Sequence, residues 1–319
     1  MKMNEKSINH FIVLFISSLF LFSCQERDRG GRTDTRTSGE ITFYADESFS
    51  PIVEELRTQF EFLYPKAHLK PVYTNEIEGF NQIKDLKTCL FFTSRALKPS
   101  EVAYLKTKRQ LPECFPIAYD GLSLIVNTAN NDTCLSVKDV KRILSGEATN
   151  WNQIVKGSTR GDIEVVFDNK NSATLHYVVD SILGGKPIDS PNIVAAKTSA
   201  DVINYVHDTP NAVGVIGSNW LNDKRDSTNT TFKKNIHVVS ISLMDEATPR
   251  NSWKPYQAYL LDGRYPFVRT IYCILVDPQR QLPYSFAHYV TNPQGQLIVF
   301  KSGMLPYRGD ILIRDVRTK

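Results

Sequence analysis

Strand patterns and helix patterns alternate along the chain from Glu40 onward, and this alternation restricts the fold more than any other feature. Short runs of β-branched and aromatic residues indicate strands, and longer segments with apolar residues three or four positions apart indicate helices. Together they predict an α/β fold with a mixed sheet and flanking helices in each of two lobes. The expected strands are 41–44, 69–73, 89–92, 117–126, 163–167, 212–216, 236–243 and 268–276, and the expected helices are 50–63, 100–108, 137–144, 175–182, 199–207, 282–289 and 294–301.

One strand-turn-helix unit, Glu164 to Leu183, contains a polar turn between its two apolar segments. Asn171 or Ser172 can cap the helix, because each side chain offers an oxygen to a free backbone amide. The same free amides, with the hydroxyls of Ser172 and Thr174 beside them, also suit a bound anion. From these residues alone, simple capping is the favoured interpretation and an anion site is the alternative.

The first 23 residues have the pattern of a lipoprotein signal peptide. Lysines precede an apolar run, Phe11 to Phe22, that is too short to span a membrane as a mature helix. The run ends in Leu-Phe-Ser-Cys, which places Cys24 where a bacterial lipobox has its acylated cysteine; an ordinary secretion signal is the alternative. Residues 25–40 lack large apolar side chains, so we predict that 24–40 is a flexible tether to a membrane.

Composition limits the classes of function that the rest of the chain can perform. About 280 residues remain, enough for two domains of ordinary size. The net charge of +4 and the lack of a dense basic patch argue against nucleic-acid binding. The six histidines are scattered, so we predict no metal site. We also predict no cofactor and expect a monomer.

The sequence also argues against an enzyme. No nucleophile elbow, zinc-protease motif or phosphate-cradling loop of the GxxxxGK[ST] type occurs. A Ser-His nucleophile formed by Ser172 and His176, four residues apart, is the alternative, but we expect His176 to lie along the helix surface.

Four cysteines follow the lipobox. Cys89 and Cys273 lie within strand-like runs and are predicted to be buried thiols. Cys114 and Cys134 flank a predicted strand and could pair in an oxidising envelope, although their spacing alone does not decide this.

Several longer stretches resemble one family, the phosphate-binding lipoproteins and periplasmic proteins of Pst-type phosphate ABC transporters. The resemblance covers nearly all of residues 41–306, and DESFSP and VFDN resemble the version found in Bacteroidetes lipoproteins. The stretches that carry it are IAYDGLSLIVNTANN at 117–131, LSVKDVKRILSGEATNWNQI at 135–154, NAVGVIGSNWL at 211–221, TSRALKPSE at 93–101 and GQLIVFKSGMLPY at 295–307.

This resemblance implies a type II periplasmic-binding-protein fold, in which two lobes close on a ligand. The first lobe is then discontinuous, 41–121 and 246–319, and the second is 122–245. Asp120-Gly121 lies within a predicted strand and is the candidate hinge, since glycine permits a bend there. The implied partners are phosphate or a similar oxyanion, an ABC permease and ATPase, and a membrane reached through the lipid anchor.

The resemblance also implies a ligand site built from backbone amides and hydroxyls. A buried oxyanion loses its hydration and needs many short, charge-assisted donors. The positions that match the family's contact turns are Ser48, Phe49, Ser94, Arg95, Ser172, Ala173 and Thr174.

The chain departs from the family where charge matters. The arginine that many relatives carry shortly before Ser-Gly-Thr is absent, and only Lys170 stands nearby. We therefore expect Arg95 to be the main cation for the ligand. Glu76 and Glu78 would repel a phosphate if they faced the cleft, and Arg95 could pair with one of them instead. A binding module of the same fold with another ligand, or with a protein partner, is the alternative function.

Overall fold

The computed structural model describes residues 31–188, 192–223 and 231–309. Cys24, the predicted signal peptide and residues 24–30 of the predicted tether lie outside these residues. The chain divides into two units, 1–34 and 35–319, and the fold below belongs to the second. No helix among the described residues has both the length and the apolar composition needed to cross a bilayer.

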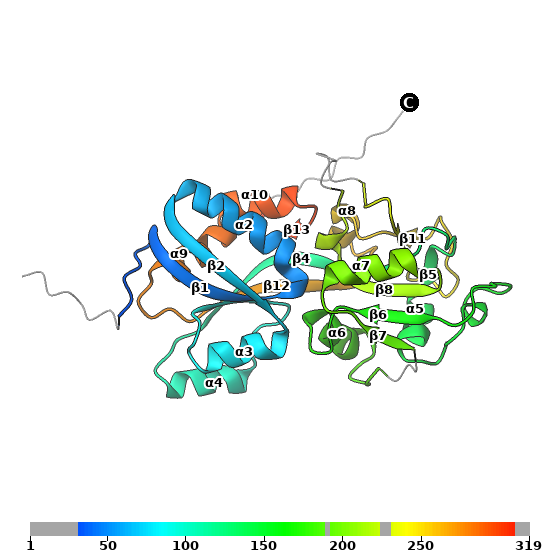
Figure 1. The fold of residues 1–319 in the computed structure, drawn as a ribbon, viewed down its shortest axis with the longest axis horizontal. Helices are drawn as coiled ribbons and strands as arrows, with labels where there is room; N and C mark the ends of the chain where they lie inside the picture. The colour runs from blue at the N-terminus through cyan, green and yellow to red at the C-terminus, as the bar shows by residue number, and fades with distance from the viewer. Residues whose placement is uncertain (1–30, 189–191, 224–230, 310–319) are drawn as a thin grey trace, which may run out of the picture. The chain divides into compact units, whose positions relative to one another are not determined.

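Most strands join one long mixed sheet in which β4 is the shared strand (Figure 1). The first part of β4 pairs with β12 and β13, and its last five residues pair with β8. We call the part of the fold on the β12 side lobe 1 and the part on the β8 side lobe 2. The order is β2-β1-β3-β12-β4-β8-β6-β7, with β13 and β9 on β4: β1 (Ser38–Asp46), β2 (Lys66–Thr74), β3 (Leu90–Thr93), β4 (Glu113–Val126), β6 (Glu164–Phe167), β7 (Ile193–Ala195), β8 (Ala212–Gly217), β9 (His237–Val238), β12 (Val268–Leu275) and β13 (Leu305–Pro306).

Helices cover the sheet and bury its apolar faces. In lobe 1, α2 (Ser50–Leu63), α9 (Leu282–Thr291) and α10 (Pro293–Lys301) lie on one side of β1 and β2, and α3 (Glu76–Lys84) and α4 (Pro99–Thr107) lie on the other (Figure 1). Two separate buried clusters reflect these two faces. The helices of lobe 2 and its border are α5 (Val137–Leu144), α6 (Ala173–Tyr177), α7 (Ser199–Asp208) and α8 (Gln257–Leu261).

The predicted α/β fold is confirmed, and the predicted elements lie close to the observed ones. β1 begins at Ser38, before the predicted end of the tether at residue 40. The predicted helix over 175–182 starts at Ala173 and continues as a π-helix over Val178–Ile182.

Two features of the structure bear on the predicted border between the lobes near residue 245. A small sheet joins β5 (Cys134–Ser136), β10 (Ser240–Ser242) and β11 (Ser252–Trp253). Tyr265 and Phe267 are also buried in the same cluster as the core of lobe 2. We therefore propose that the chain returns to lobe 1 at β12 rather than at residue 246.

The cysteines expected as pairing candidates are not paired in this structure. Cys114, near the start of β4, and Cys134, in β5 of the small sheet, both carry free thiols. Cys273 is a buried thiol, as predicted, whereas Cys89 is only partly buried.

Candidate functional site

The carboxylate of Asp46, at the end of β1, joins the two lobes. One oxygen, Oδ1, accepts from the backbone N–H of Ser48 at 3.0 Å and from its hydroxyl at 2.6 Å. The other, Oδ2, accepts from the backbone N–H of Ala173 in lobe 2 at 3.0 Å. Asp46 is fully buried, so these charge-assisted bonds replace the water that it loses on folding.

Burial raises the pKa of Asp46 to about 7, and the nearby charges of Asp168 and Glu76 raise it as well, against the hydrogen bonds from Ser48 and Ala173. A carboxyl group with such a pKa exchanges its proton near neutral pH, which an ordinary aspartate does not.

The polar turn after β6 contributes a second buried carboxylate, that of Asp168, close to Asp46. Ser172 caps α6, because its Oγ accepts from the N–H of Leu175 at 3.1 Å. The same hydroxyl donates to Asp168 Oδ1 at 2.5 Å. Among the described residues, Asp168 Oδ2 has no hydrogen-bond partner. Burial raises the pKa of Asp168 even though Ser172 donates to it.

The residues around Asp46 and Asp168, with the Ser48 and Ser172 turns, form one buried polar cluster. Arg269, on β12, is the cation of this cluster. Its side chain is fully buried, and its Nε donates to Asp120 Oδ2 at 2.9 Å. Its Nη1 donates to the hydroxyl of Thr174 at 3.3 Å, and its guanidinium lies 4.6 Å from the centre of the Phe49 ring. Nη2 lies 2.8 Å from Asp120 Oδ2, but without the geometry of a hydrogen bond, so it retains donor capacity.

Lobe 2 also holds the Ser48 turn from the side of β8. The side-chain N–H groups of Asn219 and Trp220 both donate to the carbonyl of Ser48, at 3.0 and 2.9 Å. The hydroxyl of Ser218 donates to Asp120 Oδ1 at 2.7 Å. These contacts hold the Ser48 turn, just before α2, against residues 218–220.

Glu76, the first residue of α3, makes a further ion pair between the lobes. Its Oε1 accepts from the hydroxyls of Thr93 and Ser94, at 2.6 and 3.3 Å. Its Oε2 lies 2.6 Å from Nδ1 of His176, on α6. Burial alone would raise the pKa of Glu76, but the hydrogen bonds from His176 and Thr93 outweigh it and the pKa is lowered. The hydrogen bond with Glu76 raises the pKa of His176.

Five of the seven predicted ligand residues meet in this cluster, and the other two do not join it directly. Ser94 reaches the cluster only through Glu76. The five that meet are Ser48, Phe49, Ser172, Ala173 and Thr174.

Arg95, the expected main cation for the ligand, is paired with a carboxylate outside the cluster. It forms two hydrogen bonds with Glu101, at 2.8 and 2.9 Å, and stacks on the Phe80 ring at 3.5 Å. Glu101 is already fixed there, because its carboxylate accepts from the N–H of Lys98 at the start of α4. Arg269 stands in the cluster instead, and Lys170 is exposed.

The most important residues that the sequence analysis missed are Asp46, Asp120 and Arg269. A signal existed for Arg269, which is a charged residue inside the strongly apolar run 265–276. Such a residue at a buried strand position needs a buried partner, and buried charges often mark functional sites.

Ser172 and His176 do not form the nucleophilic pair that the sequence left open as an alternative. Ser172 donates to Asp168. His176 was expected to lie along the helix surface, but its ring instead contacts Glu76. A Ser-His nucleophile is therefore not assembled from these two residues. Within the described part of the chain, no group of three or more His, Cys, Asp or Glu side chains is arranged to hold a metal ion. The arrangement instead suits a small polar ligand held by amides, hydroxyls and one guanidinium.

The ion pair of Glu76 and His176 predicts a pH-dependent stability. The raised pKa of His176 means that its contribution is complete below about pH 6.5 and is lost as pH rises through the folded-state pKa. The lowered pKa of Glu76 means that its contribution is lost as pH falls below its usual range. His176→Gln should therefore lower the free energy of unfolding by about 1–2 kcal/mol near pH 6, and by less near pH 9.

Urea unfolding of both proteins at the two pH values measures this effect. His68→Gln, at an exposed histidine, is the control and should change little at either pH. An equal loss for His176→Gln at both pH values would show that the charge of His176 does not contribute.

Comparison with known proteins agrees with this fold. The family model described as the PBP superfamily domain matches residues 30–294. The phosphate-binding protein PstS of Staphylococcus haemolyticus (strain JCSC1435) is 22% identical over 262 residues, which cover 80% of this chain and 78% of that protein. PstS of Borreliella burgdorferi (strain ATCC 35210 / DSM 4680 / CIP 102532 / B31) is 19% identical over 301 residues, with 92% and 96% covered.

A solved structure shares the same architecture. The putative phosphate ABC transporter substrate-binding protein with bound phosphate from Clostridium perfringens superposes with a TM-score of 0.68 at 18% identity, covering 85% of this chain and all of that one. At this identity the likeness shows the fold alone. The family-model match and this architecture together show that the chain belongs to the PBP superfamily and has the type II periplasmic-binding-protein fold that its sequence resembles.

Proposed function

We propose that the protein captures phosphate, or a similar small oxyanion, and delivers it to an ABC importer. The observation that carries this proposal is the meeting of the Ser48 and Ala173 amides with Arg269 at one buried point between the lobes. Backbone amides, hydroxyls and a guanidinium are the donors that oxyanions prefer. The named functions of the similar proteins support the same ligand class, and a solute-binding role rather than an enzymatic one.

The ligand has to compete with Asp46. Its carboxylate occupies the Ser48 and Ala173 donors that an oxyanion would use. An incoming oxyanion takes over these donors when Asp46 turns away or becomes protonated, and a protonated Asp46 can then donate to the ligand. The pKa of about 7 makes this protonation accessible at neutral pH.

Closure of the lobes is the motion that such a site requires. A ligand stabilises the closed form through contacts that it makes only there. Contacts between the lobes include Glu47 Oε2, which accepts from the N–H and the hydroxyl of Ser199 at 3.0 and 2.8 Å. The closed surface then binds the permease, and the ATPase supplies the energy.

A second function is favoured by one specific observation. The donors of the candidate site are engaged by the protein's own carboxylates, Asp46, Asp168 and Glu76. A binding module of the cell envelope that recognises another ligand or a protein partner needs no free anion site. Direct titration with phosphate separates this function from the first.

Phosphate binding should depend on Arg269 and not on Arg95. Arg269→Lys keeps the positive charge but loses the planar fork of donors, so we expect the Kd for phosphate to rise about tenfold or more. Arg95→Gln is the matched control and should change the Kd by less than about twofold, because Arg95 is paired with Glu101. Calorimetry of the soluble protein with phosphate, and with sulfate for comparison, gives these values.

Two outcomes of this titration contradict the proposal. No heat with either anion in the wild-type protein would favour the binding module. A loss of phosphate binding in Arg95→Gln alone would show that Arg95, and not Arg269, is the cation that binds the ligand.

Replacement of Asp46 should tighten phosphate binding at high pH. Above its pKa of about 7, Asp46 is charged and repels the anion, whereas below that pH it is neutral. Asp46→Asn should therefore lower the Kd about tenfold near pH 8 and change it little near pH 5.5. The ratio of variant to wild type at each pH cancels the titration of phosphate itself.

Glu78→Gln, which removes an acid in the first turn of α3, is the control for this comparison. Weaker binding by Asp46→Asn at both pH values would mean that Asp46 holds the ligand rather than competes with it.

We also propose that Cys24 is acylated and anchors the protein in the cell envelope, as the short apolar run ending in Leu-Phe-Ser-Cys suggests. Cys24→Ser should move the protein from the membrane fraction to the soluble fraction. Fractionation of cells followed by immunoblotting measures this, and a variant that stays with the membranes would refute the anchor.

A further inference from the structure

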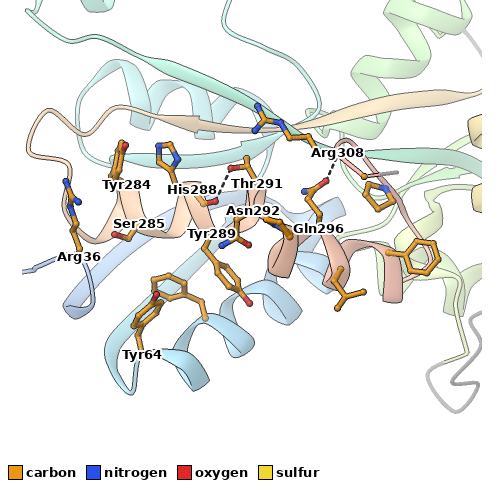
Figure 2. A pocket seen from close by; sticks show the side chains of 16 residues that line it. Arg36, Tyr64, Tyr284, Ser285, His288, Tyr289, Thr291, Asn292, Gln296 and Arg308 are labelled. Carbon is orange, nitrogen blue, oxygen red and sulfur yellow. Dashed lines mark hydrogen bonds between the residues drawn. The ribbon is translucent and has the colours of Figure 1, made fainter. Parts of the chain in front are cut away.

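A groove with a volume of about 960 Å³ lies in lobe 1 and is separate from the carboxylate cluster (Figure 2). It is lined by residues in and beside α2, α9 and α10, by Arg36, and by Pro306, Arg308 and Gly309. None of its lining residues belongs to the cluster around Asp46 and Arg269. Its volume is within the range of small-molecule sites, about 300–1,000 Å³.

The groove is apolar and partly exposed. Phe60 and Tyr289 are buried and pack edge to face with ring centres 5.3 Å apart. Tyr64, Leu297 and Phe300 leave 37%, 50% and 43% of their surface exposed. Exposed apolar side chains gathered in one concavity are typical of a ligand site or an interface rather than of a plain surface.

The described charges around the groove all have one sign. Among the described residues, no aspartate or glutamate lines it, whereas Arg36 and Arg308 do. Within the described residues, neither arginine lies within 4.0 Å of a carboxylate. Figure 2 shows Arg36 beside Tyr284 and Arg308 beside Gln296, and the N–H of Arg308 donates to Gln296 Oε1 at 2.9 Å.

The groove thus has apolar walls and two arginines without a carboxylate partner among the described residues. Such a site complements a molecule with an apolar body and one negative end. We propose that the groove binds a monomeric fatty-acid anion, with its unbranched chain along Tyr64, Leu297 and Phe300 and its carboxylate at an arginine of the rim. Burial of the chain drives binding, and the arginine contributes charge-assisted hydrogen bonds. This site does not depend on the proposed oxyanion function.

Calorimetry of the full chain carrying Cys24→Ser, which has no acylated cysteine, tests the proposal with three probes. Decanoate below its micelle concentration should bind at one site. Acetate, which has the same head group and no chain, should give no heat, and neutral decanamide should bind at least about fivefold more weakly than decanoate.

Leu297→Glu places a carboxylate in the groove and should weaken decanoate binding at least about tenfold. Leu111→Glu is the matched control, because Leu111 is 78% exposed and lies outside the groove, and it should bind decanoate like the wild type. The phosphate response of Leu297→Glu should equal that of the parent protein, which separates this site from the oxyanion site.

Several results would overturn the proposal. Absence of decanoate binding, or equal binding by Leu297→Glu, would do so directly. Binding that appears only after Leu312→Asp would mean that the chain after Gly309 occupies the groove. A dimer in sedimentation that Leu297→Glu dissociates, with no decanoate binding, would assign the groove to a second copy of the chain.

Discussion

The carboxylate of Asp46 is the interaction on which the site depends. It accepts from Ser48 in lobe 1 and from Ala173 in lobe 2, so one buried side chain connects the starts of two helices from different lobes. A buried carboxylate must replace its lost hydration with hydrogen bonds, and these donors provide them. The donors are also the ones that a bound oxyanion would need. The protein's own acid therefore occupies the position that we propose for the ligand.

Charge balance in the cluster limits which ligands the site can accept. Asp46, Asp120 and Asp168 are buried near one another, and Arg269 is the buried cation among the described residues of the cluster. A further anion is accommodated only if a carboxyl group takes up a proton or moves away. The raised pKa values of Asp46 and Asp168 mean that these groups take up a proton more readily than ordinary aspartates do. Under the proposed function, proton uptake and ligand binding are therefore coupled.

Local features of the structure could be predicted from the sequence. The strand that ends at Phe167, the Ser172 cap and the apolar faces of α2 and α10 follow from residue spacing and capping chemistry. The resemblance to a known family placed Ser48, Phe49, Ser172, Ala173 and Thr174 together, and the structure brings them together.

Long-range partners could not be predicted in the same way. Asp46 and Ala173 are 127 positions apart, and Asp120 and Arg269 are 149 positions apart, so no local pattern links them. Arg95 was predicted to be the main cation for the ligand, but the structure pairs it with Glu101, which lies only six positions away and is held by the start of α4. The later border that we propose for lobe 2 depends on the contacts of Tyr265 and Phe267, which are set by tertiary packing.

A crystal structure of the protein grown with saturating phosphate tests the central claim most directly. Our account predicts a phosphate within hydrogen-bond distance of the Ser48 and Ala173 amides and of Arg269, with the Asp46 carboxylate no longer bound to Ala173. A structure in which Asp46 keeps both contacts and no phosphate lies between the lobes would contradict it.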